Sequence, residues 1–147
     1  MPSVRYRAAT REDVQIAFEI TEDAMRGYVE ETWGTWDAKE QLQKHQTNFT
    51  HETHRLIEVE DEIAGLVAVE DFPSHLWLVK LYILQKYRNQ GIGSQVLQMV
   101  VKDASAQAKP VTLRVLRVNK RAQALYVKHG FHITEESPER LHMANGA

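Results

Sequence analysis

Apolar and polar residues alternate along the chain with two different periods, which predict two kinds of element. Seven short segments have the period of two, or the continuous apolar run, that is typical of strands. Four longer segments place apolar residues three or four positions apart, as one face of a helix does. The predicted strands are Val4–Ala8, Arg55–Val59, Ile63–Val69, Leu76–Leu84, Val111–Leu116, Phe131–Thr134 and Arg140–Met143. The predicted helices are Thr10–Gly27, a segment that begins at Asp37, Gly91–Ala108 and Ala122–His129.

Capping residues and glycines indicate where these elements begin and end. Thr10 and Asp37 are each followed three positions later by an acidic residue, which is the pattern of a helix N-terminus. Gly27 is predicted to end the first helix, and Gly130 to follow the last one in the C′ position. Gly65 stands inside a predicted strand, which indicates a bulge or a close approach of another backbone.

The order of these elements predicts the fold class. The connection from Leu76–Leu84 to Val111–Leu116 passes through a helix and is long enough for a parallel crossover. The three strands between Arg55 and Leu84 most simply form an antiparallel meander. We therefore expect a mixed α+β fold with one twisted, mostly antiparallel sheet of about seven strands, covered by helices on both faces. At 147 residues, the chain has the length of a single domain over 1–147.

Composition narrows the range of functions. The net charge of −2 gives no basic field for nucleic acid or for an anionic membrane surface. The longest apolar runs are interrupted by Lys80 or Gln98, so none could span a membrane, and no secretory signal is recognisable. We expect a cytoplasmic protein without nucleic-acid or membrane partners. The chain has no cysteine, which excludes thiolate metal sites and a cysteine-bound acyl intermediate.

The segment from Leu81 to Ser94 is the most informative part of the sequence. A buried strand runs into a polar loop with two close glycines and then into a helix, an arrangement that suits a phosphate or pyrophosphate. A Rossmann fingerprint is excluded because its third glycine is replaced by Val96, and a P-loop because no lysine follows Gly93. A tight strand-to-helix turn with no ligand stays open. What remains is the pattern Arg-x-x-Gly-x-Gly.

That pattern, at Arg88, Gly91 and Gly93, resembles the signature of the Gcn5-related N-acetyltransferases, the GNAT family. A second segment, Asn119–Phe131, is similar to the family's Asn-x-x-Ala-x-x-Leu-Tyr-x-x-x-Gly-Phe motif. The two motifs occur in the right order, with matching strands between them. Lys86 stands near a position where the family often has proline, which is a minor departure.

The resemblance implies that acetyl-CoA is the co-substrate and binds in a V-shaped gap between the strands ending at Leu84 and at Leu116. The backbone of Leu81 and Ile83 would pair with the pantetheine amides. Asn119 would lie near the pantetheine and Tyr126 near the thioester sulfur. The pyrophosphate would bind the amides of the turn formed by Arg88, Asn89, Gln90, Gly91, Ile92, Gly93 and Ser94.

The resemblance also suggests catalytic roles. The backbone N–H of Leu81 would stabilise the oxyanion, and Tyr126 would protonate the departing thiolate. Tyr126 could instead be only a packed aromatic residue. Many relatives carry a glutamate base at the position held here by Trp77, so that role cannot be transferred. Glu70, at the end of a buried strand, is the best substitute, with Asp71 and His75 as alternatives. Glu70 could equally be a solvated strand end.

The resemblance implies that the acceptor pocket is formed by the first two helices and the loop that joins them. That region contains Tyr28, Glu31, Trp33 and Trp36, and aromatic faces with nearby carboxylates attract cations. These residues predict a pocket for a small cationic amine, although the tryptophans could instead seal the core. No metal site is expected, because the segment from His51 to His54 does not have metal-ligand spacing.

The predicted function is acetyl transfer to a primary amine, from a small molecule or a peptide, by direct attack in a ternary complex. A homodimer is left open. The alternative function is a catalytically silent CoA-binding domain with the same fold.

Overall fold

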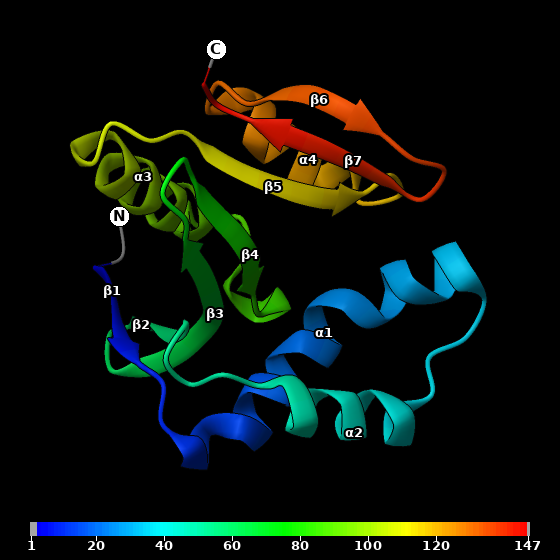
Figure 1. The fold of residues 1–147 in the computed structure, drawn as a ribbon. Helices are drawn as coiled ribbons and strands as arrows, with labels where there is room; N and C mark the ends of the chain where they lie inside the picture. The colour runs from blue at the N-terminus through cyan, green and yellow to red at the C-terminus, as the bar shows by residue number, and fades with distance from the viewer. Residues whose placement is uncertain (1–2, 147) are drawn as a thin grey trace.

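One mixed sheet of seven strands forms the centre of the computed structural model, which describes residues 3–146 (Figure 1). The spatial strand order is β1-β2-β3-β4-β5-β7-β6, and every neighbouring pair is antiparallel except β4 and β5. The strands are β1 (Val4–Ala8), β2 (His54–Val59), β3 (Glu62–Asp71), β4 (Leu76–Ile83), β5 (Val111–Leu116), β6 (His132–Glu136) and β7 (Arg140–Ala144). The helices are α1 (Val14–Trp33), α2 (Ala38–Asn48), α3 (Ile92–Ala106) and α4 (Lys120–Lys128), with short 3-10 turns at Arg11–Asp13 and Gln85–Tyr87.

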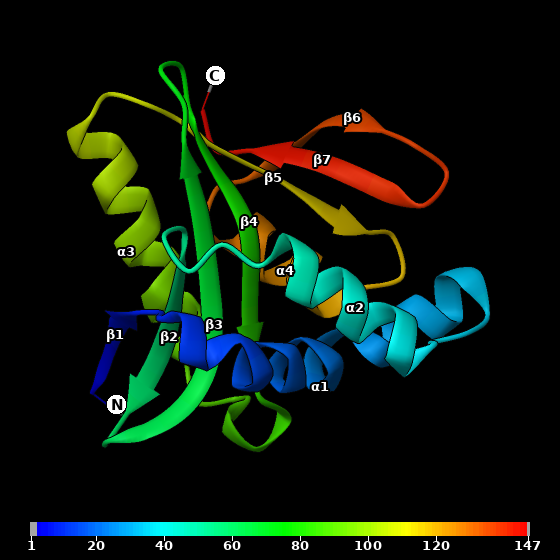
Figure 2. The same ribbon diagram turned by 60° about the horizontal axis from the view of Figure 1, so that its bottom comes forward.

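The helices cover both faces of the sheet, and each face has its own buried cluster (Figures 1 and 2). Helices α3 and α4 pack on one face, where Val96, Leu97 and Tyr126 meet buried strand residues such as Leu113 and Met143. Helix α1 packs on the other face, where Ala17 and Ile20 meet residues of β2 and β3. The predicted fold class is confirmed, because the alternating patterns along the strands supply one apolar set to each helix layer.

The first helix is longer than the sequence predicted. Helix α1 continues through Gly27 and ends at Gly34, which has φ 93° in the left-handed region. The prediction that Gly27 ends the helix is therefore wrong. A glycine inside a helix costs only about 1 kcal/mol relative to alanine, and the packed residues on either side outweigh that cost. Asp37 caps α2 as predicted, by accepting a hydrogen bond from the Glu40 amide at 3.1 Å.

The two glycines of α1 predict opposite responses to alanine. A Cβ at Gly27 would meet nothing within 4 Å, and its backbone is helical, so Gly27→Ala should raise the free energy of unfolding by about 0.5–1 kcal/mol. Gly34→Ala should lower it by about 1 kcal/mol, because alanine is strained at positive φ. Chemical denaturation of both variants checks this, and a stabilised Gly34→Ala protein would contradict the assignment of the helix end.

Strands β4 and β5 pair only at one end, which opens the sheet in its middle. Three residue pairs join them, from Leu76 opposite Val111 to Leu78 opposite Leu113, and beyond these pairs the two strands diverge (Figure 1). A bulge at Val79 in β4 accompanies the divergence, because Ala68 of β3 pairs with Lys80 while the next residue pairs with Leu78. The halves of the sheet therefore separate at the level of the bulge.

Gly65 lies where the backbones of β3 and β4 approach each other closely. A Cβ at this position would clash with the carbonyl oxygen of Tyr82 in the neighbouring strand. The close backbone approach predicted for Gly65 is thus confirmed, and it keeps β4 tightly held on its β3 side while its β5 side is open. No helix in the described range 3–146 is both long enough and apolar enough to cross a membrane.

Candidate active site

A cavity of about 640 Å³ occupies the opening between β4 and β5. Its walls are the diverging ends of these two strands, the turn before α3, one side of α4 and the second half of α1. The residues predicted from the sequence that line it are Tyr28, Trp33, Leu81, Ile83, Arg88, Asn89, Gly91, Ile92, Gly93, Ser94, Asn119 and Tyr126. The fold thus brings together residues that lie almost 100 positions apart in the chain.

The free edge of β4 offers backbone hydrogen-bonding groups to this cavity. The Leu84 amide donates to the Ala64 carbonyl of β3 at 2.8 Å, and backbone groups of successive strand residues point in alternate directions. The backbone groups of Leu81 and Ile83 therefore point away from β3, toward the side where β5 has diverged. An extended amide-containing chain could pair with them as an added strand would.

The turn before α3 presents unpaired amides at the other end of the cavity. Asn89 and Gly91 have φ values of 64° and 77°, and this pair of left-handed residues turns the chain sharply into the helix. No side chain caps α3 and no acidic residue lies in its first turn. The first-turn N–H groups of a helix have no intrahelical acceptor, and the helix dipole adds partial positive charge there. This end of the cavity is therefore suited to an anion.

Cationic side chains surround the same turn. The Arg121 guanidinium donates to Asn89 Oδ1 at 2.8 Å, which ties α4 to the turn, and Arg88 Nε donates to the Ile83 carbonyl at 3.3 Å. Lys128 also lines the cavity from α4. His129 and Ser94 lie 3.1 Å apart at Nε2 and Oγ, a second link between α4 and the first turn of α3. Together these contacts fix the position of the first turn of α3 relative to α4.

Tyr126 of α4 extends into the cavity from the side of the C-terminal motif. Its side chain is 7% exposed, and burial together with nearby Tyr82 raises its pKa above the usual value near 10. Burial raises the pKa of Tyr82 to about 12. No hydrogen bond holds the Tyr126 hydroxyl to another described residue, so the phenol is a protonated, available donor at neutral pH. Asn119 caps α4 by accepting from the Ala122 amide at 3.0 Å.

Four residues predicted for the site lie outside the cavity lining. Gln90 belongs to the turn but is exposed beside the cavity. Glu31 is exposed on α1, because the region expected to be a loop is helical and turns this side chain away. Trp36 is buried instead, and its Nε1 donates to Glu22 at 2.8 Å while its ring stacks on Phe18. The core-sealing alternative therefore describes Trp36 correctly.

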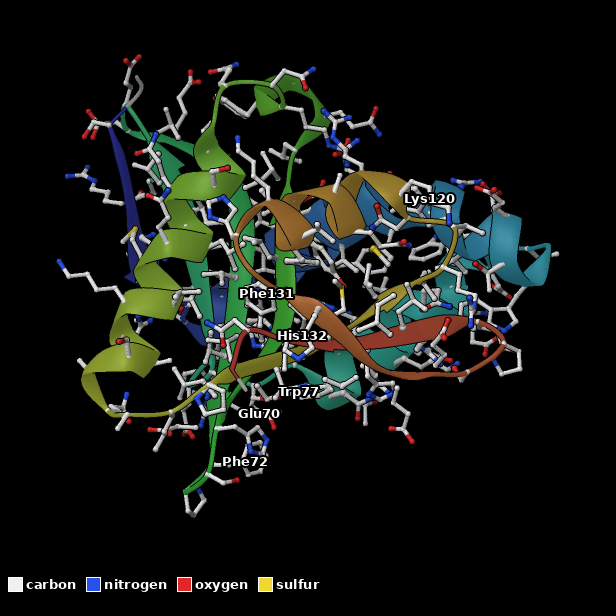
Figure 3. All side chains as sticks on the ribbon, turned by 90° about the horizontal axis from the view of Figure 1, so that it is seen from above. Glu70, Phe72, Trp77, Lys120, Phe131 and His132 are labelled. Atoms are coloured by element: carbon white, nitrogen blue, oxygen red, sulfur yellow. The ribbon has the colours of Figure 1, made fainter. Side chains whose placement is uncertain are left out.

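The predicted base, Glu70, is the fourth of these residues. It pairs with Trp77 across β3 and β4 and is exposed at the end of the hairpin, near Phe72 (Figure 3). It lies on the sheet face covered by α1 and α2, next to the position where many relatives carry their glutamate. Of the alternatives, Asp71 binds Lys109 at 2.7 Å, and His75 stacks on Phe72. None of the three lines the cavity.

Two cavity residues were missed by sequence reasoning. Lys80 in β4 and Arg114 in β5 both line the cavity. Burial lowers the pKa of Lys80. Burial also lowers the pKa values of His45 and His54, and the charge of Lys80 lowers them further. The sequence signal was visible, since Lys80 is the one charged residue in the apolar run from Leu76 to Leu84. From the sequence, Lys80 was used only to show that the apolar run is interrupted, and no role in the site was predicted for it.

His54 predicts a pH dependence of stability. Its Nδ1 lies 2.7 Å from the Thr50 carbonyl, its Nε2 is buried without a partner in the described structure, and burial lowers its pKa to about 4. Because the unfolded chain binds this proton near pH 6.5, the free energy of unfolding should fall as pH drops from about 6.5 toward 4. Denaturation of His54→Gln across this range should show a shallower slope, with exposed His132→Gln as control. An unchanged slope in His54→Gln would contradict the assignment.

Comparisons with known proteins agree with this geometry. A family model described as the acetyltransferase (GNAT) family matches residues 17–131. The fold is similar to the PaiA N-acetyltransferase of Thermoplasma acidophilum in complex with coenzyme A, with a TM-score of 0.79, 16% identity and 99% of both chains covered. It is also similar to the ribosomal-protein-S18-alanine N-acetyltransferase of Escherichia coli, with a TM-score of 0.72, 17% identity, and 97% of this chain and 92% of that chain covered.

A third similar structure is the diaminobutyrate acetyltransferase EctA of Paenibacillus lautus, in complex with L-2,4-diaminobutyric acid and coenzyme A. Its TM-score is 0.65 at 15% identity, over 98% of this chain and 95% of that chain. No curated protein sequence matches the chain. The family match covers most of the sequence, so the chain belongs to the acetyltransferase (GNAT) family. It is an acyltransferase with acetyl-CoA as co-substrate.

Proposed function

We propose that this protein moves the acetyl group of acetyl-CoA directly to a primary amine, within one complex of enzyme and both substrates. The observation that carries the proposal is the single cavity that joins the free edge of β4, the unpaired amides before α3 and the Tyr126 hydroxyl. Each suits a different part of acetyl-CoA: the pantetheine amides, the pyrophosphate and the thioester. The chain has no cysteine to carry an acetyl group between substrates, which favours direct attack.

The fit to acetyl-CoA can be assigned group by group. Leu81 and Ile83 would pair with the pantetheine through their backbone, and the amides of Ile92, Gly93 and Ser94 would bind the pyrophosphate. Arg88 and its neighbouring cations would offset the phosphate charge. Asn119 would contribute by fixing the start of α4, since its side chain already caps that helix.

The transfer step follows from the same arrangement. The neutral amine attacks the thioester carbonyl, a C–N bond forms, and the oxyanion accepts a hydrogen bond from the Leu81 N–H. When the C–S bond breaks, Tyr126 gives its proton to the sulfur. The proton that the new amide nitrogen loses restores the phenol. The amine must first lose its own ammonium proton. Glu70 would accept that proton through water, because it lies on the face of the sheet opposite α3 and outside the cavity.

Glu70→Gln should therefore lower kcat/KM most clearly below neutral pH, where the unassisted amine is more fully protonated. The expected loss is about tenfold, at the low end of general-base effects, because the carboxylate acts at a distance. Glu135→Gln, which changes an exposed carboxylate on β6, is the matched control. A pH–rate profile that superimposes on the wild type would remove Glu70 from the mechanism and leave deprotonation to solvent.

The acceptor is not defined by the fold. Of the similar structures named above, the Escherichia coli enzyme is named for an alanine of a ribosomal protein, and EctA is in complex with a small diamino acid. The pocket predicted for a small cationic acceptor loses two of its four residues, because Glu31 and Trp36 are outside the cavity. Tyr28 and Trp33 remain as aromatic lining residues.

An acceptor screen tests the proposal directly. The protein is mixed with acetyl-CoA and, in turn, with polyamines, amino acids, aminoglycosides and peptides with free N-termini, while released thiol and acetylated amine are measured. The proposal predicts thiol release that depends on one class of amine and matches its acetylation. CoA binding without amine-dependent release across the screen would instead support the silent CoA-binding domain.

A further inference from the structure

The charges around the cavity are all of one sign. Six of its lining residues are cationic, and none is an aspartate or a glutamate. Arg88, Arg121 and Lys128 belong to the turn before α3 and to α4, where the phosphates of CoA are expected. The other three are Lys80 of β4, Arg114 of β5 and Arg140 of β7. These three belong to neighbouring strands of the sheet.

The strand patterns direct these three cations to the face of the sheet opposite α3 and α4. Leu113 and Val115 of β5 are buried in the core with α3, so Arg114 between them projects to the other face. Leu141 of β7 belongs to that same core, so Arg140, the residue before it, also projects to the other face. In β4, the bulge at Val79 shifts the alternation, so that Leu81 packs against that core.

Lys80 is thereby turned toward α1 and α2, where its charge affects His45 and His54. Because Leu78 and Leu113 form the last pair before the strands diverge, Lys80 and Arg114 flank the apex of the opening. Leu81, the expected oxyanion donor, follows Lys80 directly in the chain. The two cations thus stand beside the place where the amine must attack.

These cations have no anionic partner in the described structure. None of the three takes part in an ion pair, although eight ion pairs occur among the described residues. The guanidinium groups of Arg114 and Arg140 are instead held 5.9 and 5.3 Å from the ring centroids of Trp77 and Trp33. Glu70 is on the same face but forms no ion pair with them.

Leaving a buried ammonium unpaired is costly, and structures normally pair such a charge with a carboxylate or a phosphate. Lys80 is only partly exposed, and burial lowers its pKa with no carboxylate to oppose the effect. His45 and His54 cannot supply the missing negative charge. A cation kept in this position is explained if the partner arrives with the substrate.

We propose that the acceptor amine also carries a carboxylate, and that Lys80 and Arg114 bind this carboxylate next to the thioester. The inference rests on the proposed function, because it describes the second substrate of the same site. Arg140, held over Trp33 at the end of α1, lines the outer part of the acceptor path. Free amino acids and acidic peptides share this chemistry, and the test below separates them.

The test uses pairs of amines that differ in one carboxylate: L-alanine with L-alaninamide, and the dipeptide amide Ala-Glu-NH2 with Ala-Gln-NH2. Wild-type protein should acetylate the acidic member of at least one pair with a kcat/KM about 10- to 100-fold higher, the effect expected of a charge-assisted hydrogen bond. Preference within the first pair indicates a free amino acid, and preference within the second indicates a peptide. Equal rates within both pairs, or preference for the amides, would overturn the proposal.

Three variants test whether Lys80 is responsible for the preference for the acidic member of a pair. Lys80→Met should abolish the preference for the acidic member, whereas Lys80→Arg, which keeps the charge, should retain most of it. Lys44→Met, an exposed lysine on α2, is the control for loss of one positive charge. If Lys80→Arg instead loses as much activity as Lys80→Met with both members of a pair, Lys80 is a base rather than a carboxylate ligand, and the proposal is wrong.

A binding measurement separates this proposal from the proposed function. Calorimetry of N-acetyl-L-alanine and N-acetyl-L-alaninamide, or of the two N-acetyl dipeptide amides, with CoA-saturated protein requires no turnover. Tighter binding of the acidic product, lost in Lys80→Met, supports the carboxylate site even if no amine is acetylated in the screen. Equal binding of both products in both pairs, alongside normal acetyl transfer, would overturn the carboxylate site and leave the acetyltransferase function standing.

Discussion

Tyr126→Phe is expected to lower kcat by about 10²–10⁴-fold, the range for a positioned general acid, while the affinity for acetyl-CoA stays similar. The substitution keeps the ring that packs against Phe131 at a centroid distance of 5.7 Å and removes only the proton. Because burial and Tyr82 raise the pKa of Tyr126, the phenol should stay protonated throughout the neutral range. Steady-state kinetics and calorimetry with CoA measure the two quantities separately.

Tyr6→Phe is the matched control, because this phenol in β1 lies outside the cavity. Its removal should leave kcat within a few-fold of the wild type. In wild-type protein, loss of the Tyr126 proton should not lower kcat at neutral or mildly alkaline pH, since its pKa is raised above the usual value. Near-normal turnover by Tyr126→Phe would show that this residue serves only in packing.

Gly91→Val should weaken CoA binding by at least about tenfold without unfolding the protein. Gly91 has φ 77° at the start of α3, and a β-branched residue is strongly disfavoured in that conformation. The chain would relax by rotating the peptide groups that follow, which moves the first-turn amides away from the pyrophosphate. Calorimetry with CoA measures the loss, and thermal unfolding shows whether the variant is folded.

Substitutions at Gly93 should weaken CoA binding less than Gly91→Val does. A Cβ there would meet Leu125 Cδ2 at 3.5 Å and Ile83 Cγ1 at 3.8 Å, which are ordinary contacts, and its φ is not in the left-handed region. The CoA affinity of Gly93→Ala should therefore be close to that of the wild type. The affinity of Gly93→Val should lie between those of Gly93→Ala and Gly91→Val. Undiminished CoA affinity in a folded Gly91→Val protein would rule out the turn as the pyrophosphate site.

The features of the structure that depend on local sequence patterns were predicted from the sequence. Alternation and helical spacing gave the order of the elements, and Asp37 and Gly130 marked a helix start and a helix end because capping is a local matter. Gly65 signalled the close approach of a neighbouring backbone. The two motifs around Gly91 and Tyr126 indicated the family, which the family match then confirmed.

Properties that depend on distant partners were not predictable in the same way. Gly27 was read as a helix end, but packing of α1 against the sheet carries the helix to Gly34. Trp36 was assigned to a pocket, yet its partners Phe18 and Glu22 lie in the preceding helix and hold it in the core. The direction of Lys80 depends on a bulge in β4, which reverses the alternation that a sequence pattern assumes.

Single-turnover acetyl transfer tests the central claim most directly. Protein in excess is mixed with acetyl-CoA labelled in the acetyl carbonyl and with the best acceptor from the screen, and the reaction is stopped at short intervals. Direct transfer predicts that labelled N-acetyl amine and free CoA thiol appear together, in equal amounts, while the intact mass of the protein never changes. Thiol release without labelled amide, or an acetylated protein that forms before the amide, would contradict the account.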